Sequence, residues 1–220
     1  NILTVEDPIE YTLNGIGQTQ VNNKTGYTFA KGLRAILRQD PDIVMVGEMR
    51  DIETAQIGIQ SSLTGHLVLS TVHTNSAVAA ITRLRDMGIE SFLLASSLRT
   101  IISQRLVRRL CSHCKTKDKP STKSIDIFGL DKNKSVYSAK GCDECNQTGY
   151  QGRIAIAECI QIDKTLKDFI HNNASENEIS EYVFKDNQSI DQASVDLITS
   201  GVTSCEEIIR VNNIQEDASI

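Results

Sequence analysis

The 220-residue sequence lacks any run of 18 apolar residues, the length that a membrane-spanning helix needs. It does not open with the charged stretch followed by an apolar stretch that marks a secretory leader. We therefore expect a soluble, cytoplasmic protein that reaches a membrane only through partners. Tryptophan is absent, but 40% hydrophobic and 23% charged residues are typical of a globular chain with one sizeable core and a small satellite, or two small domains.

The phosphate-binding motif G-x-x-x-x-G-K-[ST] is also absent, because no lysine follows a glycine and precedes serine or threonine. In many ATPases this loop holds the nucleotide phosphates through backbone N–H groups and its lysine. Its absence means that these residues contain at most half of a nucleotide site of this type.

Charge is spread unevenly along the chain, whose net charge is −5. Residues 99–119 contain seven bases and one acid, whereas thirteen acids stand against four bases from Glu158 onward. Such segments are more often solvated faces than binding surfaces.

Three short apolar segments predict the strands of a sheet. Residues 43–46 (IVMV) form an unbroken apolar run followed by Gly47 and Glu48, which is typical of a parallel strand buried on both faces. Residues 2–7 and 66–74 repeat this pattern of an apolar run followed by polar residues. The carboxyl ends of such strands meet at one edge of the sheet, where α/β proteins bind ligands. We therefore expect a site at this edge.

Helical patterns separate these strands and predict an α/β fold with a parallel sheet and covering helices. The expected helices span residues 28–39, residues 52–63 with Asp51 as the N-cap, and residues 76–87 with Asn75 or Ser76 as the N-cap. Residues 14–26 indicate a loop or short hairpin. A longer amphipathic helix is expected over residues 91–110. Beyond the polar segment 111–150, alternation over residues 152–162 indicates a strand, and weak helical patterns continue to the end.

Four of the six cysteines form two C-x-x-C pairs separated by 27 residues. The four are Cys111, Cys114, Cys142 and Cys145. Four thiolates suit the tetrahedral coordination of zinc, and a bound metal would stabilise a segment that has few apolar residues. Disulfides are not expected in a cytosolic chain, and a redox C-x-x-C motif would not need two copies.

The other residues near this motif have simpler interpretations. His113 lies inside the first pair, but four thiolates already complete a tetrahedron. Cys159 and Cys205 are expected to be buried, unreactive thiols. A zinc ribbon beside a basic helix would also suit a nucleic-acid-binding or adaptor module. The acidic total, the lack of interleaved aromatic residues and the absence of a binding motif argue against nucleic acid as a partner.

Polar residues that follow the three predicted strands could bind a metal and a phosphate. The carboxylates and the histidine are Glu6, Glu10, Glu48 and His73. Carboxylate oxygens suit Mg²⁺, a glutamate can orient or deprotonate a water, and a histidine can hydrogen-bond a phosphate. Three arginines could balance the phosphate charge: Arg34, Arg38 and Arg50. Any one of these residues alone is more often a cap or a structural residue, so the expectation rests on their clustering.

Long motifs resemble those of the secretion ATPase superfamily, specifically the type II secretion and type IV pilus assembly ATPases. TVEDPIEY (residues 4–11) resembles the aspartate box of that family, and LRAILRQDPDIVMVGEMRD (33–51) resembles its Walker B region. TGHLVLSTVHTNSA (64–77) resembles the histidine box, and GCDECNQTGYQGR (141–153) the second half of the tetracysteine segment. The resemblance extends from residue 1 to about residue 211.

This resemblance implies a RecA-like α/β domain over residues 1–110, a tetracysteine zinc subdomain over 111–158, and a helical C-terminal subdomain over 159–220. It implies a homohexamer that hydrolyses ATP with Mg²⁺ to assemble pseudopilus or pilus subunits, working with platform proteins of the inner membrane. Residues 74–94 favour the type II secretion branch over the pilus assembly branch.

Residue roles also follow from the resemblance. Glu6 and Glu10 of the aspartate box would act on metal and water, Glu48 would be the Walker B glutamate, and His73 the histidine-box sensor. In relatives the phosphate-binding loop precedes the first strand of this chain. We therefore expect a C-terminal part of a longer protein, monomeric and inactive as an ATPase by itself.

Overall fold

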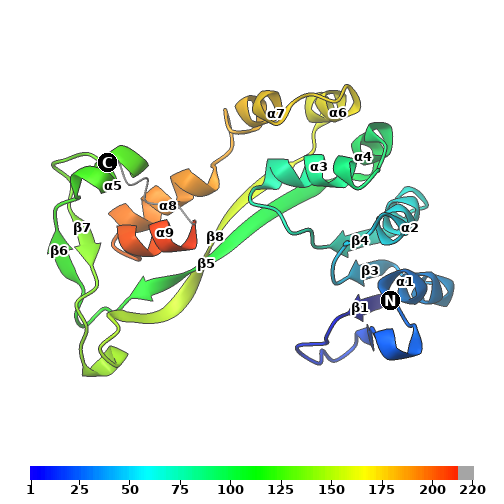
Figure 1. Ribbon diagram of the computed structural model, residues 1–220, viewed down its shortest axis with the longest axis horizontal. Coiled ribbons are helices and arrows are strands. Elements are labelled where there is room, and N and C mark those ends of the chain that lie inside the picture. Colours follow the sequence, from blue (N-terminus) through cyan, green and yellow to red (C-terminus); the bar gives the residue numbers. More distant parts are fainter. Residues whose placement is uncertain (213–220) are drawn as a thin grey trace. The chain divides into compact units, whose positions relative to one another are not determined.

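The computed structural model describes residues 1–212 of the chain (Figure 1). It contains two compact units, each made from two segments of the sequence. Unit 1 comprises Asn1–Ile101 and Ile160–Lys185, and unit 2 comprises Ile102–Cys159 and the residues from Asp186 on. In the part that is described, no helix is both long enough and apolar enough to cross a membrane.

Unit 1 is built on a four-stranded parallel sheet with the strand order β2-β1-β3-β4. The strands are β1 (Ile2–Glu6), β2 (Gly17–Gln20), β3 (Ile43–Val46) and β4 (Leu67–Ser70). The three strands predicted from apolar runs are confirmed, and so is the α/β fold class with a parallel sheet. β2 occupies the segment expected to be a loop or hairpin, because its residues are polar and give no apolar signal.

Six α-helices accompany the sheet in the described part of unit 1. They are α1 (Phe29–Ile36), α2 (Ile52–Leu63), α3 (Ala77–Asp86), α4 (Ser91–Ser97), α6 (Lys164–His171) and α7 (Glu176–Val183), with short 3₁₀ turns η1 (Asn23–Thr25) and η2 (Leu37–Gln39). Two predicted caps are confirmed. The Asp51 carboxylate accepts the N–H of Thr54 at 2.8 Å, and the Ser76 hydroxyl accepts the N–H of Ala79 at 3.1 Å.

The two faces of the sheet differ in burial. Apolar side chains of β1, β3 and α1 form a cluster; among them are Val5, Val44, Val46, Phe29 and Leu33. On β4, Leu67 and Leu69 are each 50% exposed, and Ile43 and Met45 beside them in the register are half-buried. The prediction that residues 43–46 are buried on both faces is therefore wrong for the described residues, because α1 and α2 cover one face only.

α1 lies close to the sheet because it carries a glycine where it crosses β1. A Cβ atom on Gly32 would lie 2.8 Å from Cγ1 of Val5, which is closer than such atoms approach in proteins. The sequence thus uses a residue with a low helix propensity to allow close packing of α1 on the strand that ends in Glu6.

The helices α6 and α7 pack with α2, α3 and α4 in a second hydrophobic cluster of unit 1. Its fully buried members include Ile81, Leu94, Ile160, Leu166, Ile170 and Ile179. Arg85 of α3 donates to the carbonyls of Ile170 and Ala174 at 3.0 and 2.9 Å. The division into these two units differs from the domain boundaries expected near residues 110 and 158, because helices that are far apart in the sequence pack together in unit 1. The three-part division stays a prediction, and its residues 213–220 lie outside the described part.

The described part of unit 2 contains two small sheets and three α-helices. Its strands are β5 (Thr100–Leu110) paired with β8 (Tyr150–Gln161), and β6 (Thr116–Asp118) paired antiparallel with β7 (Val136–Ser138). Its helices are α5 (Thr122–Phe128), α8 (Ile190–Thr199) and α9 (Cys205–Val211), with the 3₁₀ turn η3 (Asp143–Cys145). A hydrophobic cluster joins the β5–β8 pair to α8 and α9; it includes Val107, Ile156, Ile198 and Ile208.

The predicted helix over residues 91–110 is wrong beyond Ser97. α4 ends there, and β5 begins at Thr100, so Arg105, Arg108 and Arg109 lie on a strand. The burial of β5 alternates between neighbouring residues, as expected for a strand. The β-branched residues Ile101, Ile102 and Val107 favour this conformation.

The two cysteines outside the C-x-x-C pairs differ in burial. Cys205 on α9 is buried, which confirms the prediction for that residue. Cys159 is exposed, so the prediction for it is wrong. Side chains alternate between the faces of β8, and Cys159 lies between the buried residues Glu158 and Ile160.

A buried glutamate joins α9 to β5 in unit 2. Glu207 is 1% exposed and its carboxylate accepts hydrogen bonds from the guanidinium groups of Arg108 and Arg210 at 2.6–2.9 Å. It also accepts the backbone N–H of Arg108 at 2.9 Å. Arg108 in turn stacks 4.1 Å above the ring of Tyr150. Burial alone would raise the pKa of Glu207, but the hydrogen bonds from Arg210 and Arg108 outweigh it and lower this pKa to about 2.

Replacement of this glutamate is expected to destabilise unit 2. Glu207→Gln should lower the free energy of unfolding at neutral pH by ~1–3 kcal/mol, because two half-exposed arginines lose charged hydrogen bonds to a buried carboxylate. The folded-state pKa is depressed, so the stabilisation is present above about pH 4.5 and is lost as the pH falls towards 2. Denaturant unfolding of unit 2, compared with the exposed neighbour substitution Glu206→Gln, measures the effect. Equal stability of the two variants at pH 7 would contradict it.

Candidate functional site

The ends of three strands hold Glu48 at the carboxyl edge of the sheet. Gly47, the first residue after β3, donates its N–H to the carbonyl of Val5 in β1 at 2.8 Å. Thr71, the first residue after β4, donates its hydroxyl to the carbonyl of Gly47 at 2.6 Å. These two bonds fix the backbone on both sides of the turn, and Glu48 follows directly. The predicted site at this edge therefore has a rigid base.

Glu48 is 8% exposed and contacts two of the residues that the sequence singled out. Its Oε1 forms an ion pair with Arg50, and its Oε2 lies 3.2 Å from Nε2 of His73. The hydrogen bond from Arg50 lowers the pKa of Glu48 although burial opposes it, and the same contact raises the pKa of Arg50. The carboxylate is therefore ionised at neutral pH.

One oxygen of this carboxylate remains available to a ligand. Oε2 of Glu48 is buried, and its contact with Nε2 of His73 at 3.2 Å does not have the angles of a hydrogen bond. A buried carboxylate oxygen without such a partner is unfavourable. A divalent cation or an ordered water would satisfy it, and oxygen ligands are those that Mg²⁺ prefers. The residues present thus fit a role in holding Mg²⁺ or water.

Glu6 ends the neighbouring strand β1 and is held by two residues that the sequence did not single out. Its Oε1 accepts hydrogen bonds from the hydroxyl of Thr4 at 2.5 Å and from Nε2 of Gln18 at 2.9 Å. Glu10 lies on the exposed segment that follows β1, and within the described residues no hydrogen bond or ion pair joins it to Glu48. Residues 17–20 (GQTQ) contain no apolar side chain, so the sequence gives only a weak signal that Gln18 lies on a strand next to Glu6.

The three candidate arginines lie in different places. Arg50 contacts Glu48, as described above. Arg34 of α1 forms an exposed ion pair with Glu53 at 2.8 Å. Arg38 lies in η2 next to Gln39, whose carbonyl accepts a bond from Asn1 at 3.0 Å, and this is the amino-terminal edge of the sheet. The structure thus brings Arg50 alone of the three to Glu48, and the nucleotide-binding role of all three stays a prediction.

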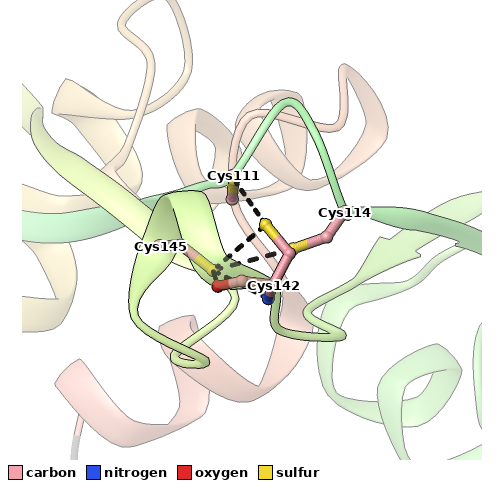
Figure 2. Close-up of side chains that lie close together, drawn as sticks. All are labelled: Cys111, Cys114, Cys142 and Cys145. Atoms are coloured by element: carbon pink, nitrogen blue, oxygen red, sulfur yellow. Dashed lines mark hydrogen bonds between the residues drawn. The ribbon is translucent and has the colours of Figure 1, made fainter.

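The four cysteines of the two C-x-x-C pairs converge at one point in unit 2 (Figure 2). Cys111 and Cys114 follow the end of β5, Cys142 is the N-cap of η3, and Cys145 is its last residue. Their sulfur atoms all lie within 4.8 Å of one another, with contacts of 3.7–3.9 Å. These separations are too long for disulfides, whose sulfurs are about 2.05 Å apart. A tetrahedron with metal–sulfur bonds of ~2.3 Å has sulfur–sulfur edges of about 3.8 Å. The site could therefore hold a metal ion.

Backbone N–H groups prepare one of these thiols for a metal. Cys145 Sγ accepts from the N–H of Gly149 at 3.1 Å and from that of Cys142 at 3.3 Å. Burial raises the pKa of Cys145, but these bonds reverse the effect and lower it to about 6. For Cys142, burial and hydrogen bonds with neighbouring thiols raise the pKa to about 12. His113 is exposed and lies outside the clustered group.

Known proteins resemble this chain over nearly its full length. It is 53% identical over 213 residues to the type II secretion system ATPase E of Vibrio cholerae serotype O1, covering 96% of this chain and 42% of that protein. It is 54% identical over 213 residues to the type II secretion system protein E of Pseudomonas aeruginosa, with the same coverage. The chain thus spans less than half the length of these curated relatives.

A solved structure gives the same picture of the fold. The crystal structure of the pilus retraction motor PilT with bound ADP matches 99% of this chain and 53% of that chain, at 27% identity and a TM-score of 0.69. Fold and similarity together assign the chain to the class of RecA-like secretion ATPases. The family model described as "Type II/IV secretion system protein" matches residues 1–210, and the chain belongs to that family.

Proposed function

We propose that this chain is the part of a type II secretion ATPase that carries the catalytic glutamate. The complete protein would hydrolyse ATP at the cytoplasmic face of the inner membrane and drive pseudopilus assembly. The observation that carries the proposal is Glu48: an ionised carboxylate at the carboxyl edge of a parallel sheet, whose buried Oε2 lies 3.2 Å from the ring of the candidate sensor His73. Identity above 50% to type II secretion ATPases over 96% of the chain supports the same function.

Residue roles in this proposal follow the motifs. Glu48 would orient or deprotonate the attacking water and would offer an oxygen ligand to Mg²⁺. Glu6 and Glu10 act on metal and water, and His73, in contact with Glu48, responds to the γ-phosphate. Arg50 balances the charge of bound nucleotide at this edge, and the same role for Arg34 and Arg38 rests on the sequence alone. Cys111, Cys114, Cys142 and Cys145 hold a structural zinc, for which the separations of their sulfur atoms are suitable.

The assembly in this proposal is a homohexamer that works with inner-membrane platform proteins, while the 220-residue chain alone is monomeric. A type IV pilus assembly ATPase is the second candidate, and similarity to a pilus retraction motor keeps it open. A strain in which the complete gene is deleted separates the two. Loss of exoprotein secretion with normal pili in this strain supports the first candidate, and loss of pili with normal secretion supports the second. Complementation with the complete gene should restore whichever function is lost.

We expect no measurable ATP turnover from the 220-residue chain by itself. Its sequence has no G-x-x-x-x-G-K-[ST] motif, so the backbone cradle and lysine for the β- and γ-phosphates are missing. Phosphate release by the purified chain and by the complete gene product that contains residues 1–220 checks this. Turnover by the 220-residue chain that Glu48→Gln abolishes would contradict the expectation.

A further inference from the structure

The strand β2 carries two glutamines whose side chains hold the segment that follows β1. Gln18 and Gln20 alternate with Thr19, so both project from the same face of the strand. Oε1 of Gln18 accepts the N–H of Leu13 at 2.7 Å, and Oε1 of Gln20 accepts the N–H of Ile9 at 3.2 Å. Two side chains of the edge strand thus replace the backbone partners that this irregular segment lacks.

Gln18 connects this segment to the carboxylate of Glu6. Its Nε2 donates to the carbonyl of Tyr11 at 3.0 Å and to Oε1 of Glu6 at 2.9 Å. A primary amide offers two donors and an acceptor, and Gln18 uses both kinds of group at once. The segment has little apolar anchoring, since Tyr11 is 79% and Leu13 52% exposed. Its conformation therefore depends on hydrogen bonds from β2.

Both hydrogen bonds to the Glu6 carboxylate go to Oε1, so Oε2 can bind another ligand. Thr4 and Gln18 both donate to Oε1, and they are neighbours in the register of β1 and β2. Fixing Oε1 in this way sets the rotamer of the side chain and directs the lone pairs of Oε2. Positioning of this kind gives a large part of the rate in active sites, where a shift of 1 Å can cost a hundredfold.

We propose that Gln18 is a positioning residue that orients the Glu6 carboxylate and holds the segment carrying Glu10 against the sheet edge. The inference rests on the proposed function, in which these carboxylates act on Mg²⁺ and water. Gln18 touches neither nucleotide nor metal in this role. It acts through Glu6 on one side and through the backbone of residues 9–13 on the other.

The first experiment needs no nucleotide and uses the 220-residue chain. Gln18→Ala should accelerate hydrogen exchange of the Leu13 amide by roughly 3- to 10-fold, as expected for the loss of one net hydrogen bond. Gln188→Ala is the matched control, since it removes an amide–carboxylate bond of 2.6 Å to Asp196 in unit 2. Thr4→Val should leave the exchange of Leu13 unchanged, because the Thr4 hydroxyl contacts the carboxylate and not the segment.

The second experiment uses the complete gene product that contains residues 1–220. Gln18→Ala and Thr4→Val should both raise the Mg²⁺ concentration that gives half-maximal ATP turnover, by tenfold or more for Gln18→Ala. Gln188→Ala should leave it unchanged. A merely structural role would lower the amount of folded protein without shifting the Mg²⁺ midpoint. If Gln18→Ala folds poorly, Thr4→Val still tests whether the hydrogen bonds to Oε1 of Glu6 affect Mg²⁺ use, because Thr4 donates to the same oxygen.

The outcomes separate this inference from the function on which it rests. An unchanged Mg²⁺ midpoint in both variants, together with loss of turnover in Glu48→Gln, would overturn the role of Gln18 and leave the proposed function standing. No turnover in the unsubstituted protein would overturn both. Unchanged exchange at Leu13 in Gln18→Ala would overturn the part of the inference that concerns the segment carrying Glu10.

Discussion

Removal of the proposed zinc by a chelator is expected to abolish hydrogen-exchange protection in β6, α5 and β7, while β1, β3 and β4 keep theirs. The segment between Cys114 and Cys142 contributes few buried apolar side chains, among them Leu130 and Val136. Its two strands have three residues each. A structural zinc contributes on the order of 10–16 kcal/mol, which exceeds the stability of most domains. Loss of the metal is therefore sufficient to unfold this segment.

Metal analysis and peptide-resolved exchange with and without chelator give the measurement. We expect about one zinc per chain, as four thiolates complete a single tetrahedral site. Cys142→Ser should reproduce the effect of the chelator, because a hydroxyl replaces a thiolate ligand. Cys159→Ser, which changes an exposed thiol outside the cluster, is the control. Full protection of β6 and β7 after complete metal removal would show that the site has no structural role.

The parts of the fold that the sequence predicted are those with strong local signals. The central strand β3 has the predicted bounds, residues 43–46, because an unbroken apolar run between Asp42 and Gly47 has few alternatives. The α2 helix also has the predicted bounds, because Asp51 caps it. In the same way, two C-x-x-C pairs determined the cysteine cluster, since a tetrahedral thiolate site needs little more than that spacing.

The parts that the sequence did not predict depend on partners far away in the chain. β5 contains apolar residues whose spacing fits a helix nearly as well as a strand, and its pairing with β8 decides between them. Cys159 was expected to be buried, but the alternation of β8 exposes it. Local propensity does not contain these tertiary contacts.

The sequence predicted which acidic residues lie at the candidate site, but it did not predict the hydrogen bonds that hold them. Glu48 and His73 follow apolar strands, so a parallel sheet had to bring them to one edge, and their contact at 3.2 Å agrees. Arg50 follows Glu48 closely in sequence and contacts its carboxylate. Gln18 could not be found in this way, because β2 is a polar edge strand whose register with β1 becomes known from the structure alone.

Replacement of Glu48 by glutamine is expected to lower ATP turnover of the complete gene product by about 10³-fold, within the range for loss of a general base. The substitution is nearly isosteric, so the turn after β3 and its bonds to Val5 and Thr71 should persist. An amide cannot accept a proton from water near neutral pH, and its nitrogen offers no lone pair to a cation. Binding of ATP should change much less than turnover, because other groups hold the phosphates.

Phosphate release and nucleotide affinity, measured on the same preparations, separate these two effects. Glu181→Gln on α7 is a matched control, since it neutralises an exposed carboxylate outside the proposed site. Loss of affinity as large as the loss of turnover would assign Glu48 to binding and not to the chemical step. Wild-type turnover in Glu48→Gln would refute the catalytic role altogether. Lost turnover with retained affinity would mean that the carboxylate acts after ATP is bound.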